Sequence, residues 1–137
     1  MSDYIQLWHK EHAKILEALT ELIKLDIFSR AGQMKLQELR RAVESHLTNE
    51  DLHLYPLLKK AAENDIGLRR ELFLFATDMD QITGEIKAFF RREERDPMSK
   101  DIPAEFYKIS CAIRSRISRE ENILMKTLEK LADPQHA

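Results

Sequence analysis

Glycine and proline are scarce in this chain, which has three glycines and four prolines among its 137 residues. Both residues interrupt helices and form turns, so their scarcity favours a few long helices over a protein of strands and turns. The single cysteine, Cys111, excludes an internal disulfide and a cysteine metal cluster. Cys111 lies in an apolar helical pattern, which predicts a small core residue rather than a nucleophile.

An excess of either charge is also missing, because 22 basic and 24 acidic residues leave a formal net charge of −2. The sequence has no basic stripe of the kind that would indicate a nucleic-acid partner. No segment approaches the ~18 uninterrupted apolar residues of a membrane-spanning helix. The first residues, MSDYIQLWHKEHAK, lack the basic start and apolar run of a signal peptide. We therefore expect a cytoplasmic protein that binds neither nucleic acid nor membrane.

Apolar residues instead recur at steps of three and four along four stretches of the chain. This periodicity predicts an all-α fold, an antiparallel up-down four-helix bundle. The expected helices lie near 3–25, 33–63, 68–94 and 103–131. Gly67 is expected to stop the second helix, and Pro103 suits the first turn of the last one. The length fits one domain, 1–137, with 132–137 as a flexible tail.

The two halves of the chain resemble each other. With a shift of 67 residues LWHKEHAKI aligns with LFATDMDQI, and with a shift of 70 ESHLTNEDLHL aligns with RSRISREENIL. The polar positions align as well, pairing His12 with Met79, His46 with Arg116, and Glu50 with Glu120. Any two amphipathic helices can align by chance, but the shared polar positions favour two helical hairpins related by a pseudo-twofold axis.

Three polar residues occupy helix positions that otherwise carry core side chains: His12, His46 and Glu50. His46 and Glu50 are four residues apart, which puts both on one helix face with Cβ atoms roughly 5–6 Å apart. Nitrogen and oxygen donors of this kind suit iron, zinc or manganese. The alternative is a pair of hydrogen-bonded core histidines with Glu50 neutralised by a neighbour, since a buried unpaired carboxylate is unfavourable. His53 is either an alternate ligand or a partly exposed residue.

The segments LWHKEHAKI and HLTNEDLHLYPLL resemble the two signature segments of hemerythrin-like, or HHE cation-binding, domains. That family is a four-helix bundle that holds non-haem iron between its helices. Its members bind dioxygen or sense oxygen, nitric oxide or iron. The resemblance implies that His12, His46 and Glu50 are metal ligands and that Glu120 is the carboxylate ligand of the second half.

Two residues depart from the family pattern, because Met79 and Arg116 stand where the second half should supply histidines. Methionine is a poor ligand for hard ferric iron, and a guanidinium has no lone pair to donate. We therefore expect at most one iron ion per chain, with Arg116 paired to Glu120 or Glu50 in place of a second ion.

Two functions remain open on this evidence. One is a non-catalytic module that binds a metal, expected to be iron, and senses iron or a small diatomic ligand. The other is a metal-free scaffold or protein-interaction domain in which the pairing of Arg116 with a glutamate replaces the metal. No catalytic set of residues indicates an enzyme, and no pattern identifies a protein partner.

Overall fold

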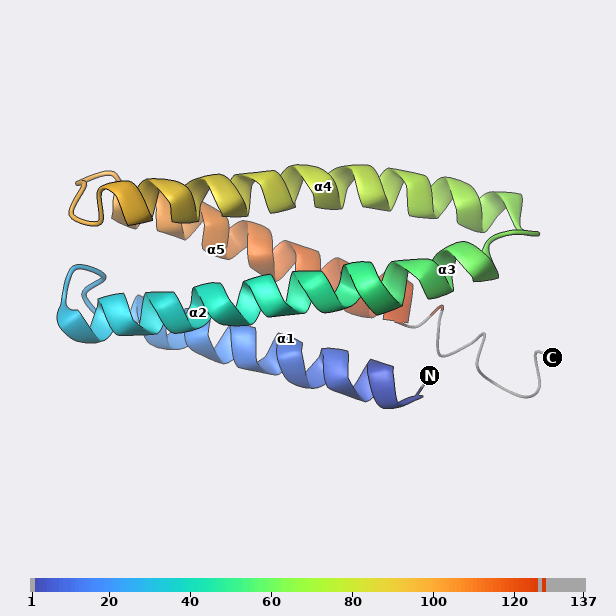
Figure 1. The fold of residues 1–137 in the computed structure, drawn as a ribbon, viewed down its shortest axis with the longest axis horizontal. Helices are drawn as coiled ribbons and strands as arrows, with labels where there is room; N and C mark the ends of the chain where they lie inside the picture. Colours follow the sequence, from blue (N-terminus) through green and yellow to red (C-terminus); the bar gives the residue numbers. More distant parts are fainter. Residues whose placement is uncertain (1, 126, 128–137) are drawn as a thin grey trace.

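The computed structural model describes residues 2–125 and 127, and Figure 1 shows them as an elongated bundle of helices. No strand occurs among these residues, so the predicted all-α four-helix bundle is confirmed. The elements are α1 (Ser2–Ile23), α2 (Arg30–Asn49), the π-helical segment η1 (Glu50–Leu54), α3 (Tyr55–Ala61), α4 (Ile66–Arg95), α5 (Ile102–Arg119) and the π-helical segment η2 (Glu120–Met125).

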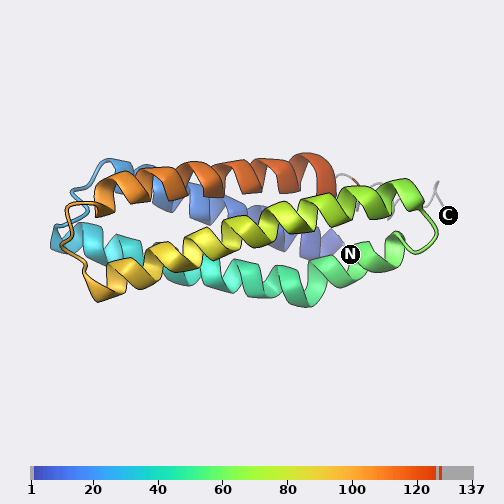
Figure 2. The same cartoon turned by 90° about the horizontal axis from the view of Figure 1, so that it is seen from above.

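The bundle consists of two antiparallel hairpins packed side by side, as the internal similarity predicts (Figures 1 and 2). Helix α1 packs mainly against α2, and α4 packs mainly against α5. The segments η1 and α3 continue the path of α2, so these three elements together form one side of the first hairpin. The N-terminus lies at the same end of the bundle as the turn between α3 and α4.

Side-chain caps explain where two of the helices begin. The hydroxyl of Ser29 accepts a hydrogen bond of 3.0 Å from Gly32 N at the start of α2, and Asp65 Oδ1 accepts one of 3.0 Å from Leu68 N at the start of α4. Because Asp65 starts α4 at Ile66, Gly67 lies in the first turn of α4. The expectation that Gly67 stops the second helix was therefore wrong, whereas Pro103 does lie in the first turn of α5.

The buried side chains form two apolar clusters separated along the bundle. The smaller cluster consists of Ile5, Trp8, Leu54, Leu58, Phe75 and Met79. The larger cluster fills the other part of the bundle, from Ile15 in α1 to Ile117 in α5. Between the two clusters lies a layer of buried polar residues that includes His12, His46, Glu50, Arg116 and Glu120.

Cys111 is exposed, so the expectation of a core cysteine was wrong. The inner face of α5 is set by Ile109 and Ile113, which are both buried. Each residue of an α-helix turns by about 100°, so a residue two positions from both isoleucines faces away from the core.

No helix in residues 2–125 and 127 is both long enough and apolar enough to cross a membrane. The expected extension of the last helix to residue 131 and the expected tail at 132–137 lie outside the described residues.

Candidate metal centre

Two histidines and two glutamates meet in the polar layer between the apolar clusters. His12 comes from α1 and His46 from α2, while Glu50 and Glu120 begin the two π-helical segments. All four side chains are buried, with relative exposures between 0% and 3%. One donor atom from each residue lies within 4.8 Å of the others. The structure therefore brings together the four residues expected from the sequence as metal ligands.

The π-helical turns bring the glutamates into this layer. Along the second helical stretch the buried residues His46, Glu50, Leu54 and Leu58 follow one another at steps of four. In a regular α-helix each step of four drifts by about 40° around the axis, so three steps would leave the inner face. A wider π turn removes this drift, and π turns occur frequently at functional sites. The equivalent turn begins 70 residues later, at Glu120.

The four donor atoms are spaced closely enough to share one ion. His12 Nε2 lies 3.0 Å from His46 Nε2 and 2.9 Å from Glu120 Oε2, and His46 Nε2 lies 3.5 Å from the same oxygen. Glu50 Oε1 lies 3.9 Å from His12 Nε2 and is also in contact with His46 Nε2. Four tetrahedral ligands at bond lengths of 2.0–2.1 Å would be about 3.3 Å apart. The observed spacings scatter around that value.

The surroundings of Glu50 Oε1 support the same interpretation. This buried oxygen faces the two histidine rings, because it contacts His46 Nε2 and lies 3.9 Å from His12 Nε2. A buried carboxylate oxygen is unfavourable unless a proton on a neighbouring ring or a cation neutralises it. The donor set of two nitrogens and two oxygens therefore fits one metal ion.

The outer nitrogen of each histidine ring is held by a carboxylate. His12 Nδ1 donates to Glu121 Oε1 at 2.9 Å, and His46 Nδ1 donates to Glu11 Oε1 at 2.8 Å. Asn49 donates to the other oxygen of Glu11 at 2.8 Å. Such bonds fix the tautomer and point the Nε2 lone pair at a metal. Sequence reasoning missed both carboxylates, although each is the immediate neighbour in sequence of a candidate ligand.

Arg116 binds both buried glutamates from the side opposite the histidines. Its Nη2 donates to Glu50 Oε2 at 3.0 Å, and its Nε donates to Glu120 Oε1 at 2.7 Å. Its Nη1 donates to Thr83 Oγ1 at 2.6 Å and to the Met79 carbonyl at 3.4 Å. Burial would raise the pKa of Glu120, but the neighbouring histidines and Arg116 hold it well below its usual range. Each glutamate thus gives one oxygen to Arg116 and one to the histidine side.

Met79 and His53 lie outside the cluster of four. Met79 is buried in the smaller apolar cluster, where its side chain packs against hydrocarbon. The ring of His53 stacks on Tyr4, with 4.9 Å between the ring centroids. His53 belongs to neither of the groups of metal-type donors found among the described residues.

The two histidines are strongly basic as the structure stands. Burial alone lowers the pKa of His12, but its contacts with Glu120 and Glu50 raise it to about 9. Burial acts in the same way on His46, and its contacts with Glu11, Glu120 and Glu50 raise its pKa to about 11. Without a metal ion, the raised pKa values favour protonated rings at neutral pH, and one of the two Nε2 atoms accepts the hydrogen bond of 3.0 Å that joins the rings.

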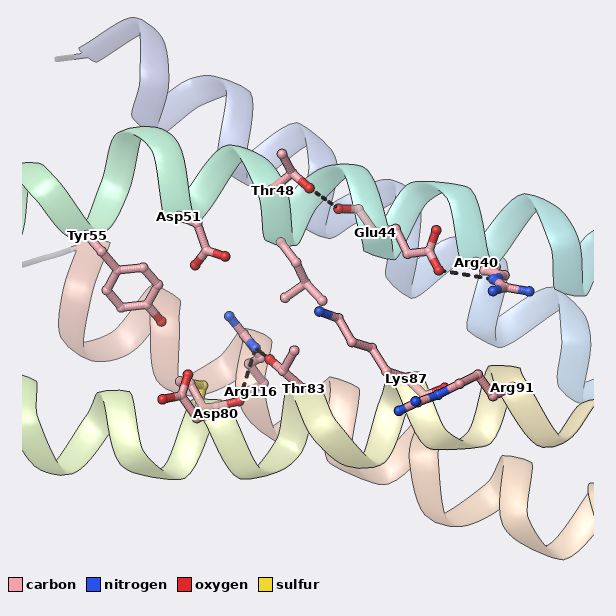
Figure 3. A pocket seen from close by; sticks show the side chains of 12 residues that line it. Arg40, Glu44, Thr48, Asp51, Tyr55, Asp80, Thr83, Lys87, Arg91 and Arg116 are labelled. Atoms are coloured by element: carbon pink, nitrogen blue, oxygen red, sulfur yellow. Dashed lines mark hydrogen bonds and ion pairs between the residues drawn. The ribbon is translucent and has the colours of Figure 1, made fainter.

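An open cavity reaches the site from the seam between α2 and α4. Its volume is about 510 Å³, and Arg116 forms part of its wall (Figure 3). Asp51, Tyr55 and Asp80 lie toward one end of the view, and Lys87 lies toward the other. None of the four clustered histidines and glutamates lines this cavity. A molecule that enters here meets Arg116 before it meets the histidines.

A much smaller void adjoins the cluster from inside the larger apolar core. Its volume is about 10 Å³, and it touches His46, Arg116 and Glu120 as well as several aliphatic side chains. A space of this size holds about one molecule as small as water.

These features define a helical bundle that carries a buried histidine–glutamate centre between its two hairpins. The chain belongs to the hemerythrin family, because the family model described as the hemerythrin HHE cation-binding domain matches residues 3–128. The resemblance inferred from the two sequence segments is therefore confirmed. No curated protein and no solved structure matches the chain significantly.

Proposed function

We propose that this protein binds a single non-haem iron ion at His12, His46, Glu50 and Glu120, and that it senses iron or a small diatomic ligand without catalysing a reaction. The observation that carries the proposal is the convergence of four buried donor atoms within 4.8 Å of one another. The family's description as a cation-binding domain supports it independently. Nitrogen and carboxylate donors suit iron, zinc and manganese, and the family resemblance favours iron among them.

The charge of the layer supports one ion rather than two. Glu50 and Glu120 contribute −2 and Arg116 contributes +1, so the net charge with neutral histidines is −1. The guanidinium takes the oxygens that would otherwise face a second ion, because it binds Glu50 Oε2 and Glu120 Oε1. A second divalent ion would have no free carboxylate oxygen and would lie against a fixed positive charge.

The protein's own residues would hold the ion and restrict what reaches it. His12 and His46 are oriented by Glu121 and Glu11, and Arg116 keeps the two ligand glutamates in place. A bound iron ion would supply a redox-active centre that can coordinate a small ligand. The void of about 10 Å³ beside the cluster supports a ligand of diatomic size rather than a larger molecule.

A second function, a metal-free scaffold, is favoured by the pairing of Arg116 with both glutamates. With Arg116 and protonated histidines, the buried carboxylates are neutralised without any ion. In that case the polar layer would fix how the two hairpins pack, and the protein would act through its surface.

Metal analysis separates these two functions. We expect protein reconstituted with ferrous iron to retain one ion per chain, and His46→Ala to lose it because one of four ligands is removed. His53→Ala is the matched control, since His53 lies outside the cluster and should not affect iron content. No retained iron in the natural sequence would favour the scaffold.

Restoring the family's histidines tests the role of Arg116. We expect Met79→His combined with Arg116→His to raise the capacity to two ions per chain, because both changes add donors and one removes the competing charge. Two ions in the natural sequence would show that the one-ion proposal is wrong.

A further inference from the structure

A second group of metal-type donors lies on the solvent side of His12, around the carboxylate of Glu121. Glu121 Oε1 is 2.9 Å from His12 Nδ1 and 3.2 Å from His9 Nδ1. The three donor atoms lie within 4.8 Å of one another. The side chains of His9 and Glu121 are 44% and 38% exposed, whereas that of His12 is 1% exposed. This outer group therefore connects the surface of the protein to the buried His12 ring.

The spacing of the outer donors fits a transition-metal ion. Separations of 2.9 Å and 3.2 Å are close to the distance of about 3.3 Å between tetrahedral ligands with bonds of 2.0–2.1 Å. Two imidazole nitrogens and one carboxylate oxygen are donors that divalent ions of this class accept. Three protein ligands leave one position for water, as in sites where the ligand exchanges. The alternative is a surface pairing of His9 with Glu121, which would contribute little to stability.

His12 belongs to both groups through opposite ring nitrogens. A neutral imidazole has one N–H and one lone pair. With an ion at Nδ1, the proton resides on Nε2, which donates to Glu120 Oε2 at 2.9 Å. With an ion at Nε2, the proton resides on Nδ1, which donates to Glu121 Oε1. One neutral His12 ring can therefore serve the outer or the inner group, but not both together.

We propose that His9, Glu121 and His12 Nδ1 form a solvent-facing capture site for a divalent transition-metal ion, which is occupied while the inner site is empty. The four inner donors are buried, and the cavity between α2 and α4 is lined by Arg116 but by none of these four residues. The outer group offers a first binding position next to them, and the ion leaves it when the inner donors take over. The role as a capture site rests on the proposed function, because the inner site is the destination of the ion.

Loading kinetics test the capture role in the full-length protein. Apo protein is mixed with cobalt(II), and the visible absorption of the bound ion is followed with time. We expect His9→Gln to load about tenfold more slowly, which corresponds to about 1.4 kcal/mol in the barrier, and to reach the same final occupancy. His53→Gln is the matched control, because it removes a histidine outside both groups and should load at the natural rate. Equal rates for the natural protein and His9→Gln would overturn the proposal.

A variant with a disabled inner site tests the outer site alone. His46→Gln combined with Glu50→Gln removes two inner donors and leaves the outer group intact, and circular dichroism checks that the variant folds. We expect one weak cobalt(II) site, and a further change of His9→Gln should abolish it. If the natural protein holds no buried ion, the proposed function fails. The outer site is then tested by comparing the double variant with and without His9→Gln. Cobalt(II) binding that is lost with His9→Gln supports the outer site, and equal cobalt(II) binding by the two proteins overturns it.

Discussion

At the scale of single residues, Arg116 is the buried cation that pairs with both glutamates of the polar layer. Its side chain is only 5% exposed, yet it donates to Glu50, Glu120, Thr83 and the Met79 carbonyl. A buried guanidinium with that many acceptors is stable, whereas a buried carboxylate that loses its cation is not. Removing either Arg116 or the glutamates would therefore leave the other side of the pair as an uncompensated buried charge.

Replacing Arg116 by leucine should destabilise the metal-free protein by about 3–5 kcal/mol, because one oxygen of each buried glutamate loses its partner. The measurement is urea unfolding of metal-free protein. Arg119→Leu is the matched control, since Arg119 forms a largely exposed pair with Asp78 at 3.1 Å. That control should lose less than about 1 kcal/mol. Equal losses in the two variants would mean that the buried ion pairs contribute no more than the exposed one.

The raised pKa values of His12 and His46 predict how stability depends on pH. Their folded-state pKa values, about 9 and about 11, lie above the ordinary value of 6.5, so the folded metal-free protein binds more protons than the unfolded chain. The resulting stabilisation is complete below pH 6.5, declines as pH rises above that value, and is fully lost only above the folded-state values of about 9 and about 11. We therefore expect the unfolding free energy of metal-free protein to fall between pH 7 and pH 9.5.

Metal binding should show the opposite trend, because an ion that binds both Nε2 atoms must displace any proton they carry. Affinity for zinc or ferrous iron should rise over the same pH range, which titration at several pH values would show. A metal-free protein that becomes more stable toward pH 9.5 would contradict the assignment of protonated histidines.

At the scale of elements, periodicity predicted the four helical stretches but not their local geometry. The expected helix 33–63 is divided into α2, η1 and α3, because the π turn at Glu50 interrupts the regular pattern. Three successive steps of four, from His46 to Leu58, were the signal in the sequence for that turn. Helix α4 begins at Ile66, two residues before the expected start, and because the Asp65 cap was not recognised Gly67 was given the wrong role.

The beginning of α2 provides a stability test at this scale. A Cβ atom on Gly32 would lie 2.1 Å from the carbonyl oxygen of Asp26, which belongs to the backbone and cannot move aside easily. Gly32→Ala should therefore cost about 1–3 kcal/mol. Gly84→Ala in α4 is the matched control, because outside the adjoining backbone of its own helix no atom lies within 4 Å of its added Cβ. That variant should be neutral or more stable by up to about 1 kcal/mol. The measurement is the melting temperature of both variants. Equal melting temperatures would contradict the close approach at Gly32.

At the scale of the whole molecule, the polar layer joins the two hairpins. His12, His46 and Glu50 belong to the first hairpin, whereas Arg116 and Glu120 belong to the second. Helix α1 contacts α5 and α3 contacts α4, but a cavity opens along the seam between α2 and α4. The sequence predicted His12, His46 and Glu50 because each lies on an apolar face, and the family resemblance added Glu120. It also predicted that Arg116 pairs with Glu120 or Glu50, which the structure confirms. That Arg116 binds both at once depends on how the hairpins pack, which the sequence does not show.

A metal ion bound at this layer should therefore stabilise the whole bundle. Its four ligands come from both hairpins, so unfolding of either one releases the ion. An ion at 100 times its dissociation constant adds about 2.7 kcal/mol to the unfolding free energy. For a domain of this size each kcal/mol raises the melting temperature by roughly 3–4 °C, so we expect a rise of about 8–11 °C.

Two variants make this last prediction specific. His46→Ala should abolish the rise, because it removes one of the four ligands. Glu11→Gln should only reduce it, because Glu11 orients His46 without belonging to the four-residue cluster, and loss of such a partner weakens metal binding by about 10–100-fold. At a fixed metal concentration, the metal-induced rise in melting temperature should be largest for the natural protein, smaller for Glu11→Gln and absent for His46→Ala. A melting temperature that no metal concentration changes would instead favour the scaffold, in which Arg116 and the protonated histidines already neutralise the layer.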